Sequence, residues 1–132
     1  MVADVRARFV RYESPVEDAK GRHVGVFGLV NVLGRADRLS PEDHRFWRSH
    51  NEWYDATLDC PAPEAYDELV NPLAAAWFKA TATQFLEPVP GCLAILRRHG
   101  VECVERWSDD PGRTVYEDRH QVVVVPRADR ET

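Results

Sequence analysis

The densest group of polar side chains lies between residues 116 and 121, where the pattern predicts that one strand passes into the next. Glu117 and His120 could carry acid–base or binding chemistry if they faced a cleft shared with Trp77 or Lys79. One interpretation is an ion pair between Lys79 and Glu117. We favour a hairpin turn in which Asp118 binds its own backbone, with Lys79 in solvent. The candidate ligand-binding residues are Trp77, Lys79, Tyr116, Glu117, Asp118 and His120.

The cysteines do not indicate a metal or redox site. Cys60, Cys92 and Cys103 contain no CxxC pair, which favours reduced thiols over a disulfide framework. Cys92 lies in the first turn of a predicted helix, where the dipole would favour a thiolate, but a buried cysteine is the simpler interpretation. The spacing of Cys92, His99, Cys103 and His120 matches no zinc signature. The GxSxG, P-loop and GxGxxG motifs are missing as well, so we expect no metal, no cofactor and no catalytic residue.

A stripe of aromatic rings follows helical spacing between residues 46 and 54. Such a stripe can line a ligand pocket, but more often it forms part of a core, and we favour the core. Its members are Phe46, Trp47, His50, Trp53 and Tyr54.

The charge distribution favours a protein partner over nucleic acid. Seventeen basic and 22 acidic residues give a net charge of -5, which opposes binding to a phosphate backbone. Residues 41–70 are strongly acidic, and Glu52, Asp55 and Asp59 are the candidate partner-binding residues on this stretch. Solubility alone would also explain the acidic surface.

The length of 132 residues suits one domain over residues 1–132. The longest unbroken apolar run is Val122 to Val125, far shorter than the roughly 20 residues of a membrane helix. The first residues contain no apolar region of the kind found in signal peptides. We therefore expect a cytoplasmic protein with no membrane contact.

The elements begin with a strand over residues 5–9 and a loop over 13–22. Residues 23–33 fit both a helix and a strand, and Gly34 as a following cap residue favours the helix. Ser40 and Pro41 predict the start of a helix over 41–57, followed by a short helical turn at 64–69.

The second half is predicted to hold helices over residues 71–85 and 91–99, then strands over 101–107, 113–117 and 121–125. The last strand, rich in valine, should lie centrally, and residues 127–132 should fray. The predicted fold class is α+β. An antiparallel sheet of about four strands, the N-terminal strand plus a C-terminal meander, would carry three to four helices packed on one face.

Two sequence motifs carry a resemblance. They are Trp77-Phe78-Lys79 and the run from Asp110-Pro111-Gly112 through Val115-Tyr116-Glu117-Asp118 to Gln121-Val122-Val123. With the Arg38-Leu39-Ser40 lead into an acidic helix, the chain resembles a group of small uncharacterised bacterial proteins over residues 24–125. The resemblance implies a compact bacterial domain and transfers no activity.

Two functions follow as expectations. The first is a non-catalytic module that binds another protein, or a second copy of itself, through its acidic helix face or an exposed sheet edge. The alternative is a small-molecule binder or cofactor-free enzyme with a site around Trp77, Lys79 and the hairpin at residues 116–120.

Overall fold

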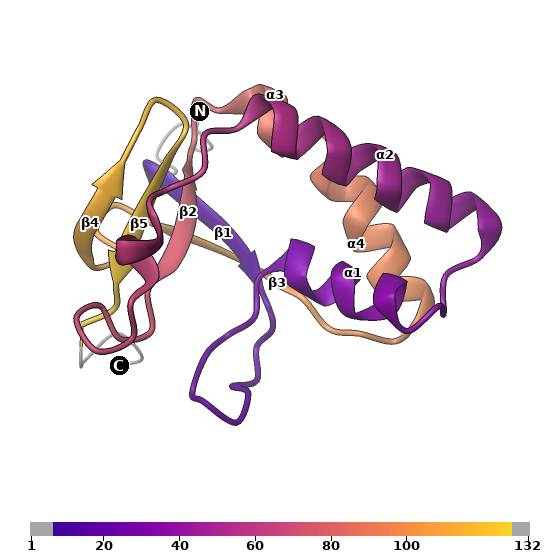
Figure 1. Cartoon of the computed structure of the whole chain (residues 1–132), viewed down its shortest axis with the longest axis horizontal. Helices are drawn as coiled ribbons and strands as arrows, with labels where there is room; N and C mark the ends of the chain where they lie inside the picture. Colours follow the sequence, from indigo (N-terminus) through magenta and orange to yellow (C-terminus); the bar gives the residue numbers. More distant parts are fainter. Residues whose placement is uncertain (1–6, 128–132) are drawn as a thin grey trace. The chain divides into compact units, whose positions relative to one another are not determined.

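The computed structural model describes residues 7–127 and has an α+β fold with one five-stranded antiparallel sheet (Figure 1). The elements are β1 (Phe9–Glu13), α1 (Val26–Arg35), α2 (Pro41–Thr57), the 3-10 turn η2 (Pro63–Tyr66), β2 (Ala75–Lys79), α3 (Thr83–Leu86), α4 (Val89–Arg98), β3 (Val104–Ser108), β4 (Arg113–Glu117) and β5 (Gln121–Val125).

The chain divides into two compact units, and each is built from several segments. The sheet unit comprises Met1–Arg11, Asp59–Thr83 and Glu105–Thr132, and the helical unit comprises Tyr12–Leu58 and Gln84–Val104. The expectation of a single domain over residues 1–132 stays a prediction, as does the packing of helices on one face of the sheet.

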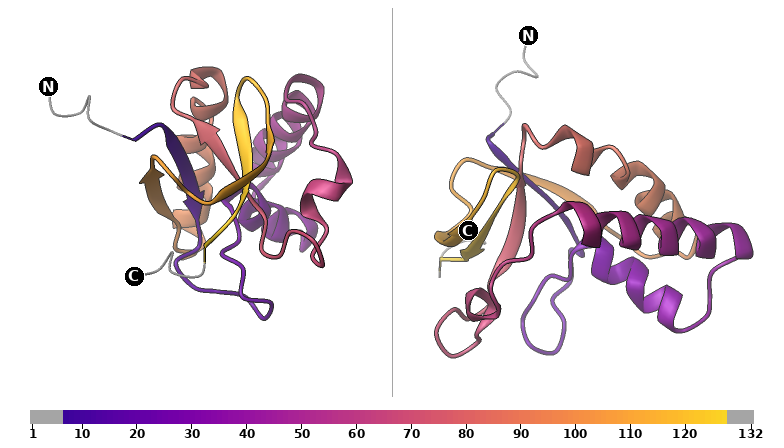
Figure 2. Two further views of the ribbon diagram at one scale, coloured as in Figure 1. Left: turned by 90° about the vertical axis from the view of Figure 1, so that its left-hand side faces the viewer. Right: turned by 45° about the horizontal axis from the view of Figure 1, so that its top comes forward.

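The strand order is β3-β1-β2-β5-β4, and the strands can be followed in the left view of Figure 2. β5 is an internal strand, as its valines predict, and Val122, Val123 and Val124 are buried. The predicted bounds of β4 and β5 are confirmed. The predicted three-stranded meander is wrong, because β3 lies beside β1 at the opposite edge of the sheet. Strands that follow each other in sequence usually pair, but here β1, β2 and β5 lie between β3 and β4 in the sheet.

The predicted helix over residues 71–85 is also wrong. Trp77 and Lys79 lie on β2, which pairs with both β1 and β5, and only Thr83–Leu86 is helical. Leu73 has a φ of 62°, which is incompatible with a helix continuing from Asn71. A short run of apolar residues fits the period of a helix as well as that of a strand. In β2, pairing with β1 on one side and with β5 on the other outweighs the low strand propensity of alanine.

The first strand begins at Phe9 and runs to Glu13, so the prediction of a strand over residues 5–9 has the wrong bounds. Residues 5 and 6 lie outside the described residues. Most of the tail that we expected to fray, residues 128–132, also lies outside them. Arg127, at its start, forms an ion pair with Asp110 at 2.7 Å.

Helices α1, α2 and α4 share an apolar core in the helical unit. Its buried members are Val26, Val30, Leu33, Trp47, Cys92, Ile95 and Leu96. The Trp47 indole N–H donates to Asn31 Oδ1 at 2.8 Å and so joins α2 to α1. Arg98 pairs with Asp43 at 2.6 Å and joins the end of α4 to the first turn of α2. The buried Trp47 and His50 confirm a core role for part of the aromatic stripe.

The helix ends follow capping chemistry. Ser40 accepts the Asp43 backbone N–H at 3.1 Å, with Pro41 at the first helical position, as predicted for α2. The helical interpretation of residues 23–33 is confirmed by α1, but Gly34 lies inside that helix and does not follow it. The left-handed residue that ends α1 is Asp37, with φ 60°.

The fourth helix starts earlier than predicted. The predicted helix begins at residue 91, whereas α4 begins at Val89 and holds Pro90 in its first turn. Proline fits there because the first turn needs no backbone donor. Within the described part of the chain, no helix has the length and apolar character needed to cross a membrane.

Candidate functional site

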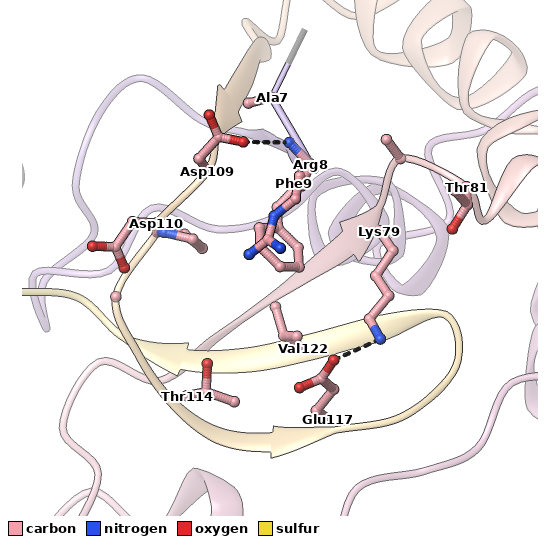
Figure 3. Close-up of a pocket in the computed structure, with 13 residues that line it drawn as sticks. Ala7, Arg8, Phe9, Lys79, Thr81, Asp109, Asp110, Thr114, Glu117 and Val122 are labelled. Carbon is pink, nitrogen blue, oxygen red and sulfur yellow. Dashed lines mark hydrogen bonds and ion pairs between the residues drawn. The ribbon is translucent and has the colours of Figure 1, made fainter.

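The sheet unit carries an open pocket of about 610 Å³ (Figure 3). The start of β1, the end of β2 and the connection from β3 to β4 surround it, and side chains of β4 and β5 complete it. The lining residues are Ala7, Arg8, Phe9, Lys79, Ala80, Thr81, Asp109, Asp110, Pro111, Gly112, Thr114, Glu117 and Val122.

The register of the sheet brings the central lining residues together. Phe9 pairs with Lys79 across β1 and β2, and Glu117 pairs with Val122 across β4 and β5. Val122 also pairs with Trp77, which is two residues before Lys79 on β2. Because directly paired residues share a face, and alternate residues of a strand do too, all five side chains lie on one face of the sheet.

Lys79 and Glu117 form an ion pair across β5. The Lys79 Nζ lies 2.6 Å from Glu117 Oε2, and the side chains are 25% and 53% exposed. The ion pair considered in the sequence analysis is therefore present, in place of the solvated lysine that we favoured. An ion pair this exposed contributes about 0–1 kcal/mol, so a ligand can replace it at little cost.

Arg8 supplies a second cation to the pocket, and the sequence analysis missed it. Its backbone N–H donates to Asp109 Oδ1 at 3.0 Å, which ties the start of β1 to the residue after β3. Its guanidinium lies over the Phe9 ring (Figure 3), and the distance from the Arg8 Cζ to the ring centroid is 5.2 Å. No local signal could have identified it, because the contact joins residues 101 positions apart.

The other predicted ligand residues lie outside the pocket lining. Trp77 is buried against Val122 and Val124. Asp118 accepts the backbone N–H groups of His120 and Gln121, at 2.8 and 3.1 Å. This geometry agrees with the turn role that we favoured for Asp118.

Two pKa shifts follow from the same turn. Although burial works in the opposite direction, hydrogen bonds from His120, Tyr116 and Gln121 hold the pKa of Asp118 below its ordinary value. The Tyr116 hydroxyl donates to Asp118 at 2.7 Å, and this bond is the main cause that raises the pKa of Tyr116 to about 12. Both groups stabilise the turn in these protonation states, and neither is suited to act as a base or acid near neutral pH.

The predicted partner-binding residues are divided between the two units. Glu52 and Asp55 are exposed on α2, three residues apart and so on one side of the helix. Asp59 is exposed in the sheet unit, beyond the end of α2, and its carbonyl accepts the Gln121 side-chain N–H at 2.9 Å.

Between α2 and β2 the chain exposes apolar side chains that the sequence analysis also missed. Leu69 is 95% exposed, Val70 67% and Leu73 42%. Residues 59–73, here called the acidic apolar segment, contain Asp59, Glu64, Asp67 and Glu68 and no lysine or arginine. The segment includes η2 (Figure 1). The local signal for this surface is the pair Leu69-Val70, which lies between Asp67-Glu68 and Pro72.

Cys92 and the metal-ligating side chains are candidates for a second site. Cys92 is buried, and burial raises its pKa to about 12, so its thiol is unreactive. Over residues 7–127, no group of His, Cys, Asp and Glu side chains could hold a metal ion.

Comparisons with protein-family models, with curated proteins and with solved structures find no match to this chain.

Proposed function

We propose that this protein is an interaction module that binds a basic, apolar segment of another protein through the acidic apolar segment. The observation that carries the proposal is the exposure of Leu69 and Val70 in a stretch with four carboxylates and no cation. Adjacent exposed apolar side chains bordered by charge are typical of protein interaction sites.

Charge complementarity identifies the kind of partner. Lysine or arginine side chains of the partner would pair with the carboxylates while its apolar side chains cover Leu69 and Val70. Glu52 and Asp55 on α2 add to the net charge of -5, which attracts a basic partner over longer distances. A second copy of this chain is a poorer occupant, because a symmetric contact would place the four carboxylates against each other.

The experiment uses two labelled peptides of about 12 residues, one alternating lysine with leucine and the other glutamate with leucine. Fluorescence anisotropy should show that the lysine peptide binds the full chain and that added salt weakens binding. The double substitution Leu69→Ser, Val70→Ser should weaken binding about tenfold, because it removes about 1.4 kcal/mol of apolar burial.

Val16→Ser is the matched control, because Val16 is 69% exposed and lies in the helical unit. It should leave the affinity unchanged. Equal binding of both peptides, or an unchanged affinity in the double variant, would contradict the proposal. Sedimentation velocity on the chain alone completes the test, since a dimer that the double variant abolishes would assign this surface to a second copy instead.

A further inference from the structure

The pocket on the sheet contains one cation without a charged partner among the residues that the structure describes. Lys79 is paired with Glu117 at 2.6 Å, and Asp110 is paired with Arg127 at 2.7 Å. The Arg8 guanidinium forms no such pair within residues 7–127 and rests on the Phe9 ring. A ligand entering the pocket therefore meets an accessible guanidinium, two carboxylates that are each paired with a cation, and Asp109, whose carboxylate accepts the Arg8 backbone N–H.

Guanidinium has a planar fork of N–H donors that matches the two oxygens of a carboxylate. The phosphate group offers similar geometry, but Asp109, which lines the pocket and forms no ion pair within residues 7–127, would repel a doubly charged ligand more strongly than a singly charged one. A single negative charge suits this balance better. The half-buried Phe9 ring offers apolar surface beside the guanidinium, which fits a ligand with an apolar body (Figure 3).

We infer that the pocket binds a small organic monocarboxylate, whose carboxylate pairs with Arg8 and whose apolar body lies on Phe9. The site shares no residue with the acidic apolar segment, so the inference goes beyond the proposed function and does not depend on it. The bond from the Arg8 backbone to Asp109 fixes the start of β1 and so positions the guanidinium. Lys79 and Glu117 border the same pocket, and the opposite charges of their ion pair compensate each other.

The test is an NMR titration of the ¹⁵N-labelled full chain with three probes of similar shape: benzoate, benzamide and phenyl phosphate. Benzoate should give saturable shifts of the amide signals of Arg8, Phe9 and Thr114. Neutral benzamide should bind at least about fivefold more weakly, because about 1 kcal/mol of charge-assisted hydrogen bonding is lost. Phenyl phosphate should also bind more weakly than benzoate.

Arg8→Gln should raise the dissociation constant of benzoate at least about fivefold, for the same reason. Arg45→Gln is the matched control, because Arg45 is exposed on α2 and does not line the pocket. It should leave the titration unchanged. Because Arg8 is exposed, the variant should keep the amide spectrum of the folded protein away from the pocket.

Four results would overturn the inference. They are no saturable shift with benzoate, equal binding of benzamide, tighter binding of phenyl phosphate, and an unchanged dissociation constant in Arg8→Gln.

Discussion

His50 is a buried histidine that contacts three aromatic rings. It is 8% exposed, and its Nε2 has no hydrogen-bond partner in the described part of the chain. The rings of Tyr54, Phe27 and Phe46 lie 4.6, 5.1 and 5.7 Å from the imidazole, centroid to centroid. Burial lowers the pKa of His50 below its ordinary value of 6.5, because the protonated ring would lose hydration, and a hydrogen bond with Asn51 opposes this shift only in part.

The lowered pKa makes the stability of the protein dependent on pH. In the unfolded chain His50 binds a proton at higher pH than in the folded protein, so protonation favours unfolding. The stabilising contribution is complete above 6.5 and is lost as the pH falls below 6.5 toward the folded pKa. Urea denaturation at pH 7.5 and pH 5.5 should show a lower free energy of unfolding at the lower pH.

The variant His50→Phe should reduce this pH dependence, since it keeps an aromatic ring and removes the titrating group. His99→Gln is the control, because His99 is the C-cap residue of α4, is only half-buried and lies outside the aromatic contacts of His50, so this variant should keep the wild-type difference between the two pH values. If the free energy of unfolding fell equally for the wild type and for His50→Phe between pH 7.5 and pH 5.5, the pH dependence would not come from His50.

Single residues of the pocket could be predicted only where local sequence carried a signal. Lys79 follows two aromatic residues and is one of only two lysines, which makes it a candidate site residue. Glu117 is a candidate because it lies in a dense run of polar residues. Arg8 could not be singled out, because its place depends on Asp109, 101 positions later. Contacts over such separations depend on the strand order, which no local pattern specifies.

At the scale of elements, prediction succeeded where capping or turn chemistry marks a boundary. Ser40-Pro41 marks the start of α2, and the valine run with its flanking turns marks β5. Prediction failed at β2, whose five residues form a strand because β1 and β5 pair with it on either side. Strand pairing in the folded protein overrides weak local preference, and a window of sequence contains no information about that pairing.

The packing of α1 on α2 supplies a prediction with an internal control. A Cβ added at Gly34 would lie 2.5 Å from ring atoms of the buried Trp47, so Gly34→Ala forces the ring or the helix to move. We expect a loss of about 2 kcal/mol in the free energy of unfolding, measured by urea denaturation, as is usual for overpacking.

Gly28→Ala is the control in the same helix. There the nearest atom to an added Cβ is a terminal methyl of Val24, at 2.9 Å, which can rotate or shift more easily than the indole. The higher helix propensity of alanine, about 1 kcal/mol over glycine, opposes this smaller strain. Gly28→Ala should therefore destabilise far less than Gly34→Ala, and equal losses would contradict the packing described here.

The N-terminal cap of α2 gives a second prediction at this scale. Ser40→Ala removes the acceptor of the Asp43 backbone N–H and should cost about 1 kcal/mol. Ser49→Ala, at an exposed position in the middle of the same helix, should be neutral or slightly stabilising. Thermal melts followed by circular dichroism would compare the two, and an equal effect would show that Ser40 is not the effective cap.

At the scale of the whole molecule, the two compact units are interleaved along the chain. The chain passes from one unit to the other four times, after Arg11, Leu58, Thr83 and Val104. Each unit is built from separate segments of the chain. Folding one unit brings these segments together, and the segments of the other unit then form the loops that connect them. Each unit alone is also small for an independent core. Both arguments favour unfolding as one cooperative body, in line with the single domain expected from the sequence.

The substitution Gly34→Ala tests that cooperativity, because it acts inside the helical unit only. Urea denaturation followed by NMR should show amide signals of both units disappearing at one midpoint, about 1 M below that of the wild type. A destabilisation confined to one independent domain would instead lower the midpoint of the helical signals and leave signals such as those of Val123 on β5 unchanged. The coincidence of the two midpoints thus distinguishes one domain from two, by a measurement that needs no knowledge of the ligand or partner.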